Sequence, residues 1–504
     1  MPVPEHFDVL IVGAGISGID GAYHLKKECP GKSFVMLEAL ESFGGTWHWH
    51  KYPGIRSDSD LYTFGYGFKP WIGAPIATAA EILKYLGDVI AENDLVPHIR
   101  YRHRVAQARW SSTDNLWYIE ASDDKGRAAA FTCNFLWMCQ GYYRHAEGYT
   151  PDWPGMDEFR GPVVHPQTWP EGLNYANKRV LVIGSGATAA TLVPAMAPDS
   201  AHVTMLQRSP TYFFPDRNRN RLADTLRELD VDEEIVHDIV RRKIVRDQAK
   251  FLERAIADPE TVKADMLRGL SPFLSDAEIE KNFTPNYRPW RQRIALVPDA
   301  DLFRALQSGK ASVVTDEIAR FTETGVQLKS GKEIATDIVV TATGFNICPL
   351  GDVRFIVDGK TVTFSETVTY RGMMFTGLPN LVWIFGYFRA ASWTLKADLV
   401  ARFVCRLLNA MGARGAKKVS VELRPEDEGM ELAAWVDTEV FNPGYLQRGM
   451  QLLPRRGNKP EWEPSQDYVW EKEALPRVSF DDPIFVFRDT QTAPAENPAE
   501  RKKI

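Results

Sequence analysis

The sequence predicts an α/β protein with two Rossmann-like dinucleotide-binding domains and a helical insertion in the second domain. Two observations support this fold class. Two glycine-rich turns each follow an apolar, β-branched segment and precede a segment with helical spacing. A long charged stretch of helical periodicity follows the second turn. The 504 residues are enough for two or three domains, each with its own core.

The first nucleotide unit is a strand–helix–strand at the start of the chain. Residues 7–12 (FDVLIV) are apolar and β-branched and predict a strand. A helix is expected after the glycine turn, to about residue 27, and residues 33–37 predict a second strand. This βαβ setting makes a nucleotide site credible, which a glycine motif alone does not.

Within that first turn (GAGISG) each glycine has its own role. Gly13 permits the tight turn, Gly15 lets the backbone approach a pyrophosphate, and Gly18 permits close packing of the helix. Glu38 ends the second strand, 20 residues beyond Gly18, where a carboxylate accepts hydrogen bonds from a ribose diol. The unit therefore predicts a site for a nucleotide with free ribose hydroxyls.

A second unit of the same kind lies in the middle of the chain. Residues 179–183 and 202–206 predict strands on either side of the turn GSGATA at 184–189. Arg208 follows the second strand, and a guanidinium there suits the 2'-phosphate of NADP, which a carboxylate would repel. The predicted NADP contacts are Gly184, Ser185, Gly186, Thr188, Arg208, Ser209 and Thr343.

The two units are suited to different nucleotides. This difference predicts a flavoprotein that is reduced by a nicotinamide nucleotide. FAD in the first unit and NADPH in the second is the simplest assignment. A tight strand-to-helix connection without a ligand is the alternative for either turn alone. A ligand-free connection is a much poorer explanation when both turns occur in one chain in this order.

The domain boundaries follow from the segments between these units. Apolar residues at helical spacing from 221 to 256, with a break near Pro259, predict the helical insertion. Strand patterns near 313–314, 325–328 and 338–341 then lead to a crossing back to the first domain. The predicted parts are FAD-binding 1–145 and 344–488, NADP-binding 151–214 and 289–343, insertion 215–288, and a polar, disordered tail 489–504.

Composition and charge exclude several classes of protein. A net charge of −6 and a pI near 6.0 leave no broad basic field, so we expect no nucleic-acid partner. No apolar run approaches the roughly 18 residues of a membrane-spanning helix, and the first residues lack a secretory pattern. Five scattered cysteines without a C-x-x-C pair predict reduced thiols and a cytoplasmic location.

No metal site is expected from the sequence. His48 and His50 flank a tryptophan, but neither has the neighbouring carboxylates or thiols that complete a ligand set.

A pattern between the two nucleotide units narrows the family. Residues 159–170 (FRGPVVHPQTWP) match F-x-G-x-x-x-H-x-x-x-W-P, which resembles the fingerprint of type I Baeyer–Villiger monooxygenases. The resemblance implies a linker role for His165, which would tie the two domains through hydrogen bonds near the flavin. Phe159, Gly161 and Trp169 are the other predicted linker residues.

A second pattern supports the same resemblance. Residues 44–58 match G-G-x-W-x-x-x-x-Y-P-G-x-x-x-D at every position, and this also resembles the Baeyer–Villiger family. Trp47 and Tyr52 could wall the isoalloxazine against water, although a simple core role for both stays open. The predicted FAD contacts are Gly13, Gly15, Gly18, Glu38, Gly45, Thr46, Trp47, Tyr52 and Asp58.

The predicted catalytic pair also comes from the resemblance. Residues 286–296 (NYRPWRQRIAL) resemble the family segment that delivers the active-site arginine, which is then Arg293, with Asp58 holding it in place. In this family reduced flavin and O2 give a C4a-peroxyflavin that attacks a ketone. A permanently charged guanidinium can stabilise the resulting oxyanion. Gln292 replaces a lysine of the commoner pattern, and Arg208 or Arg291 would compensate, so we expect NADPH to be preferred.

Three further segments refine the resemblance. Residues 52–60, 184–189 with 206–212, and 391–398 together resemble the ethionamide-activating group of these monooxygenases. This implies an enzyme that converts ketones to esters or lactones and also oxidises thioethers or thioamides. The alternatives are a flavin-containing S/N-monooxygenase, a disulfide reductase-like enzyme, or a non-enzymatic nucleotide-binding protein. A disulfide reductase needs a redox thiol pair, which Cys133 and Cys139 do not supply.

Overall fold

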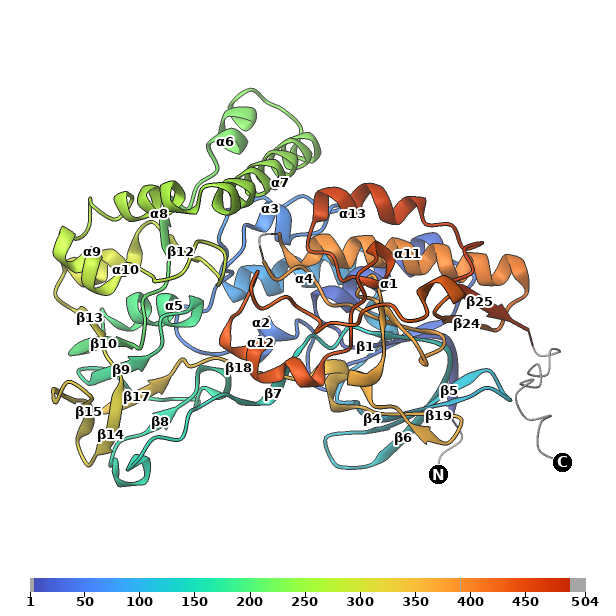
Figure 1. Ribbon diagram of the computed structural model, residues 1–504, viewed down its shortest axis with the longest axis horizontal. Helices are drawn as coiled ribbons and strands as arrows, with labels where there is room; N and C mark the ends of the chain where they lie inside the picture. Colours follow the sequence, from blue (N-terminus) through green and yellow to red (C-terminus); the bar gives the residue numbers. More distant parts are fainter. Residues whose placement is uncertain (1–3, 390, 490–504) are drawn as a thin grey trace.

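A large mixed sheet forms the first nucleotide unit, and the computed structural model describes residues 4–389 and 391–489 of the chain. Its strand order is β20-β19-β4-β5-β6-β1-β2-β3, with β23 also paired to β6 (Figure 1). The strands are β1 (Glu5–Val12), β2 (Phe34–Leu37), β3 (Ile99–Arg100), β4 (Arg104–Ser111), β5 (Leu116–Ser122), β6 (Ala128–Met138), β19 (Arg354–Val357), β20 (Lys360–Thr361) and β23 (Leu381–Trp383).

Both faces of this sheet are covered, which explains why its central strands are apolar throughout. Along β1, Val9 and Ile11 pack into one core cluster, whereas Leu10 and Val12 pack into another. The helices that pack with the first cluster are α1 (Ile16–Glu28), α4 (Ala79–Glu92) and α11 (Trp393–Arg414). Two short helices, α2 (Thr46–Trp49) and α3 (Leu61–Phe64), lie between β2 and α4 in the chain.

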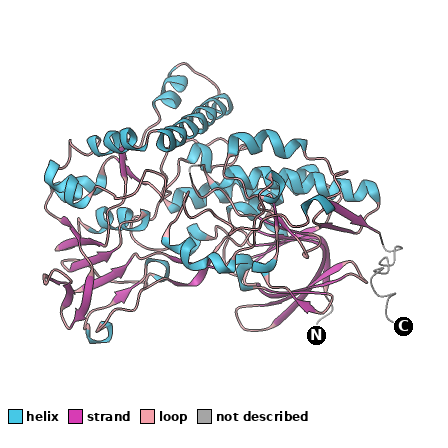
Figure 2. Cartoon of the chain, in the orientation of Figure 1, coloured by secondary structure: helices cyan, strands magenta, loops and turns pink. Residues whose placement is uncertain are grey.

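A smaller parallel sheet forms the second unit, in the order β13-β10-β9-β17-β8. Figure 2 shows the strands of both sheets on the lower side of the view, with most helices above them. The strands are β8 (Val163–Val164), β9 (Arg179–Ile183), β10 (His202–Gln207), β13 (Ala311–Thr315) and β17 (Ile338–Thr341). Helices α5 (Ala187–Met196) and α10 (Asp301–Gln307) pack against it, and β14 (Ile318–Thr322), β15 (Gly325–Leu328) and β16 (Glu333–Ala335) form an antiparallel sheet nearby.

Four helices lie between β10 and β13 of the second unit in the chain and stand at the upper left of Figure 1. They are α6 (Arg221–Glu228), α7 (Glu233–Ala257), α8 (Pro259–Arg268) and α9 (Asp276–Asn282), between β11 (Phe213–Asp216) and β12 (Ala295–Pro298). The helical nature of the segment is confirmed, but the break near Pro259 is only a corner. Asp258 accepts a hydrogen bond from the Thr261 N–H, and Pro259 occupies the first helical position, where its missing N–H matters least.

The chain then returns to the first sheet. The remaining elements are β7 (Tyr143–Gly148), β18 (Phe345–Ile347), β21 (Thr369–Tyr370), β22 (Met374–Phe375), β24 (Lys418–Val421), β25 (Phe485–Arg488), α12 (Gly444–Gly449) and α13 (Tyr468–Ala474). Strand β18 pairs with β7, so the crossing point joins the segments on either side of the second unit.

The predicted fold class is confirmed, and the predicted strands of both units are present with bounds shifted by at most two residues. Among the described residues no helix is both long enough and apolar enough to span a membrane. The predicted tail lies outside the described residues from position 490 onward.

Candidate functional site

One large cavity, of about 1220 Å³, reaches both glycine-rich turns. Its walls come from the carboxyl ends of β1, β2, β6, β9 and β10, where nucleotides bind in open α/β sheets. The geometry of these walls therefore decides which chemistry the chain can support.

The first turn is shaped for a close approach of its backbone to a ligand. Gly13 has a φ of +103°, which side-chain-bearing residues rarely adopt. A Cβ on Gly18 would lie 1.9 Å from the Gly13 carbonyl oxygen, so α1 can pack against the turn only because this residue is glycine. Gly13 and Gly15 line the cavity, whereas Gly18 does not, as its predicted packing role requires.

Glu38 lies in the cavity wall at the end of β2. It is 6% exposed, and its carboxylate accepts hydrogen bonds from the backbone N–H groups of Ala14 (2.8 Å) and Leu40 (2.9 Å). Burial raises the pKa of this carboxyl group, and the two backbone donors oppose that shift. The carboxylate is therefore held rigidly where a ribose diol would meet it.

The other predicted FAD residues also line the cavity. Gly45 and Thr46 lie at the start of α2, and the Trp47 ring packs edge-on against Phe64 at 5.6 Å. Tyr52 is 7% exposed and belongs to a core cluster of the second unit while also facing the cavity. The core and cofactor roles that the sequence leaves open for Tyr52 are thus compatible.

All seven predicted NADP residues line the same cavity. Arg208 is exposed and has no ion pair with any residue that the structure describes, so its charge is available to a phosphate. Arg291, the other candidate cation, pairs with Glu439 at 3.1 Å and is not in the cavity wall. The structure therefore does not bring Arg291 to the nucleotide cavity, whereas Gln292 beside it lines the cavity.

The predicted catalytic pair is formed. Arg293 donates from Nη1 to Oδ2 of Asp58 at 2.8 Å, and both side chains line the cavity with 33% and 42% exposure. Burial lowers the pKa of the Arg293 guanidinium, but the Asp58 carboxylate and three nearby tyrosines together outweigh burial, so the net pKa lies above its usual value. Arg293 is therefore a permanent cation in the cavity wall.

Three tyrosines near this cation have no counterpart among the predicted residues. Tyr142 donates from its hydroxyl to the Tyr143 hydroxyl oxygen at 2.9 Å, and its ring stacks on Trp393 at 5.1 Å. The Tyr445 hydroxyl is buried and has no hydrogen-bond partner in the described part of the chain. Tyr142 and Tyr143 follow the end of β6, a position that a search of strand ends would have found, whereas nothing local points to Tyr445.

The predicted linker residues join the second unit to the crossing point. His165 donates from Nε2 to the Gly344 carbonyl oxygen at 3.0 Å and accepts from the Gln167 N–H at Nδ1 (3.1 Å). Burial lowers the pKa of His165, which favours this neutral tautomer. Phe159 and Trp169 pack into separate clusters of the second unit, outside the cavity wall.

Comparison with known proteins identifies the family. Residues 76–421 match the family described as flavin-binding monooxygenase-like, and residues 11–85 match the NAD(P)-binding Rossmann-like domain. The chain belongs to the flavin-binding monooxygenase-like family. Its predicted cofactors, FAD and NADPH, are confirmed by this membership and by the two nucleotide sites.

Individual relatives of this monooxygenase agree. The FAD-containing monooxygenase EthA of Mycobacterium tuberculosis (strain CDC 1551 / Oshkosh) is 45% identical over 481 residues, covering 95% of this chain and 97% of EthA. The crystal structure of OTEMO in complex with FAD and NADP has a TM-score of 0.76 at 20% identity, covering 96% of this chain and all of the other. The ε-caprolactone-bound structure of cyclohexanone monooxygenase has a TM-score of 0.74, with the same identity and coverage. The predicted resemblance to Baeyer–Villiger monooxygenases is confirmed.

Proposed function

We propose that this monooxygenase converts ketones to esters or lactones with O2 and NADPH, and that it also oxidises thioethers. The observation that carries the proposal is the Arg293–Asp58 pair in the wall of the cavity that holds both glycine-rich turns. A similar structure supports it, because that protein is a cyclohexanone monooxygenase bound to ε-caprolactone, which is a lactone. We also propose the division into FAD-binding, NADP-binding and insertion segments that the sequence predicts.

A flavin held beside the first glycine turn would supply the chemistry that activates O2, with electrons from NADPH. The protein supplies charge and shape around that reaction. When a nucleophile adds to a ketone, negative charge develops on the carbonyl oxygen, and Arg293 can stabilise it without losing its own proton. Asp58 positions the guanidinium by accepting a hydrogen bond from Nη1. Among the described residues nothing else accepts from the guanidinium, so its further N–H donors stay free for a substrate.

Aromatic side chains border one side of this cation. The Tyr142 ring stacks on Trp393, and Tyr143 lies 4.5 Å from the Phe345 ring, so one side of the cavity beside Arg293 is apolar. In such surroundings the guanidinium acts more strongly on nearby negative charge than it would in water.

The arrangement of thiols argues against a disulfide reductase. Cys133 and Cys139 are buried and free, and burial raises the pKa of both thiols, which is the opposite of what a redox-active cysteine needs. All five cysteines are free, which supports the proposed reducing, cytoplasmic location.

One experiment separates the proposed function from its alternatives. NADPH oxidation by the purified yellow protein is followed with a ketone, a thioether and a disulfide in turn, and products are identified by mass. An ester or lactone from the ketone supports the proposal. Sulfoxide without ester favours an S/N-monooxygenase, thiol formation favours a reductase, and no substrate-dependent turnover favours a binding protein.

A further inference from the structure

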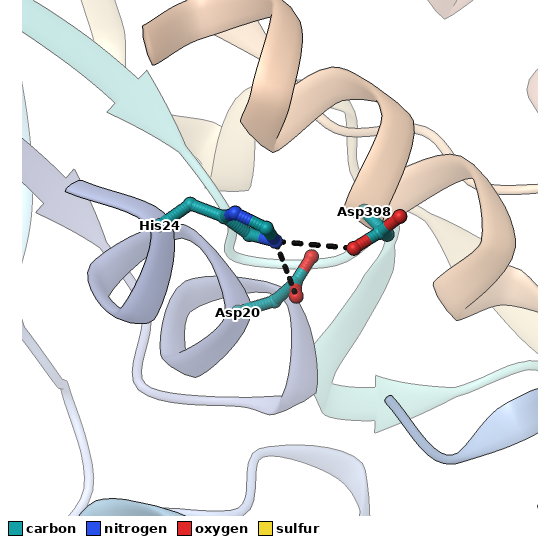
Figure 3. A group of neighbouring side chains, drawn as sticks. All are labelled: Asp20, His24 and Asp398. Carbon is teal, nitrogen blue, oxygen red and sulfur yellow. Dashed lines mark hydrogen bonds and ion pairs between the residues drawn. The ribbon is translucent and has the colours of Figure 1, made fainter. Parts of the chain in front are cut away.

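A cluster of charged side chains lies between α1 and α11, away from the cavity already described. Figure 3 shows Asp20 and His24 from α1 facing Asp398 from α11. One ligand atom from each residue lies within 4.8 Å of the other two. His24 Nε2 is 3.1 Å from Asp398 Oδ1 and 3.8 Å from Asp20 Oδ1. None of the three residues lines the cofactor cavity.

A fourth residue sets the orientation of the imidazole. Glu28, one turn beyond His24 on the same helix, accepts a hydrogen bond from His24 Nδ1 at 2.8 Å. His24 Nε2 donates to Asp398 Oδ1 at 3.1 Å, and a cation that replaced this proton would meet the Nε2 lone pair beside two carboxylates. Metal-binding histidines in proteins are held in this way, with a carboxylate on the nitrogen that does not bind the metal.

Asp20 is the second, independent observation that points to a cation. Its side chain is 0% exposed, and neither carboxylate oxygen has a hydrogen-bond partner within residues 4–389 and 391–489. A buried carboxylate without a hydrogen-bond donor is unfavourable, and His24 Nε2 at 3.8 Å is too far away to donate, so a cation held between the two side chains would stabilise Asp20.

The arginines nearby do not meet this need. Arg402 pairs with the outer oxygen of Asp398 at 3.3 Å and is 55% exposed. Arg241 donates from Nη1 to the backbone carbonyl oxygens of Tyr62, Thr63 and Gly65. Neither arginine makes an ion pair with Asp20 in the part of the chain that the structure describes.

We propose that Asp20, His24 and Asp398 bind a divalent transition-metal cation, of which Zn²⁺ is the best match, and that this ion fastens α1 to α11. One imidazole and two carboxylates are a nitrogen–oxygen set that suits Zn²⁺, whereas Mg²⁺ and Ca²⁺ prefer oxygen ligands alone.

The distances also suit zinc. Ligands at about 2.1 Å from a tetrahedral zinc lie about 3.4 Å from one another. The separations of 3.1 and 3.8 Å from His24 Nε2 lie on either side of that value. Asp20 offers both of its oxygens, so bidentate binding would close the site with a distorted rather than a regular tetrahedral geometry. A closed site away from the cavity is structural rather than catalytic.

The test measures metal content and thermal stability of the flavin-loaded protein. Protein produced in zinc-supplemented medium and freed of loose metal by gel filtration is expected to retain about one Zn²⁺ per chain. Asp20→Asn and His24→Gln should each reduce retained zinc to a small fraction of that value. Glu28→Gln should weaken binding by about 10- to 100-fold, because it releases the imidazole orientation.

A matched control is Asp94→Asn. Asp94 is an 86% exposed carboxylate that pairs with Lys26. Lys26 lies on α1, the helix that carries Asp20 and His24, but Asp94 is not part of the proposed site, so its replacement should leave zinc content unchanged. Zinc should also raise the midpoint of thermal unfolding for the unmodified chain and the control, but not for Asp20→Asn.

Crystals of the unmodified protein give a test that no variant can spoil. A peak in anomalous scattering at the zinc edge between the three side chains supports the site. No peak and no stoichiometric zinc or manganese after supplementation would overturn it. Metal content that survives both ligand substitutions would also overturn it. A more stable, metal-free Asp20→Asn variant would assign the missing charge to a proton.

Discussion

Arg293 Nη1 lies 2.8 Å from Asp58 Oδ2, a contact between residues 235 positions apart in the chain. Both side chains are partly exposed, so the pair contributes at most about 1 kcal/mol to stability. Its value is therefore in holding a cation at the cavity wall, and its loss should affect turnover far more than folding.

Replacing either partner tests this directly. Arg293→Ala should lower kcat for a ketone by about 100-fold or more, because a charge stabiliser is lost. Asp58→Asn should lower it by roughly tenfold, since the cation stays but loses its anchor. Arg291→Gln is the matched control, because Arg291 pairs with Glu439 outside the cavity. Equal losses in control and test variants would contradict the assignment. Steady-state kinetics and the unfolding midpoint are the measurements.

The His165 hydrogen bond to Gly344 predicts a defect in coupling. His165→Gln should leave the flavin content unchanged but should divert NADPH oxidation from product to hydrogen peroxide, because the crossing point loses a tether. The measurement is the ratio of product to NADPH consumed, beside the flavin absorbance. A variant that oxygenates normally would show that the tether is dispensable.

Arg208 should set the preference for NADPH. Arg208→Gln removes the exposed cation in the second glycine unit and should raise KM for NADPH by about tenfold or more, with little change for NADH. Kinetics with both nucleotides provide the comparison. An unmodified enzyme at least tenfold more efficient with NADH would refute the assignment of this site.

His237 on α7 should make stability fall in mild acid. Its ring accepts from the Trp71 N–H (3.2 Å) and lies 3.2 Å from the Tyr66 carbonyl oxygen. Burial, followed by Arg241, lowers its pKa to about 4. Between pH 6.5 and 4 the unfolded chain then binds a proton that the folded chain does not, so stability decreases as pH falls.

The measurement is the unfolding midpoint from pH 8 to 4 for the unmodified chain and for His237→Asn. The variant is expected to be less stable near pH 7 and to lose less on acidification. His202→Asn serves as a control, since His202 is the first residue of β10, is only partly buried and bonds to Ser312. Parallel pH curves for unmodified and His237→Asn proteins would exclude the histidine as the cause.

Gly18→Ala should abolish flavin retention. The added Cβ would lie 1.9 Å from the Gly13 carbonyl oxygen, so either α1 or the turn must move. Gly31→Ala, at a position with open space around the new carbon, should retain flavin. Flavin absorbance per chain decides between them, and full retention by Gly18→Ala would contradict the packing role.

Local sequence pattern was sufficient for the two nucleotide units. The apolar strands β1 and β9 and the glycine turns after them depend on contacts within a few dozen residues, and their positions matched the prediction closely. Glu38 and Arg208 follow from the same local geometry, because each directly follows or ends the second strand of its unit.

Long-range packing decided the rest. Tyr445 beside Arg293, and Asp398 beside Asp20, lie in segments that the fold brings back to residues far away in the chain. Arg291 turned toward Glu439 although its neighbours face the cavity. Such contacts depend on where helices pack and which side chains become buried. Packing and burial are determined by the whole core, so the residues adjacent in sequence do not reveal them.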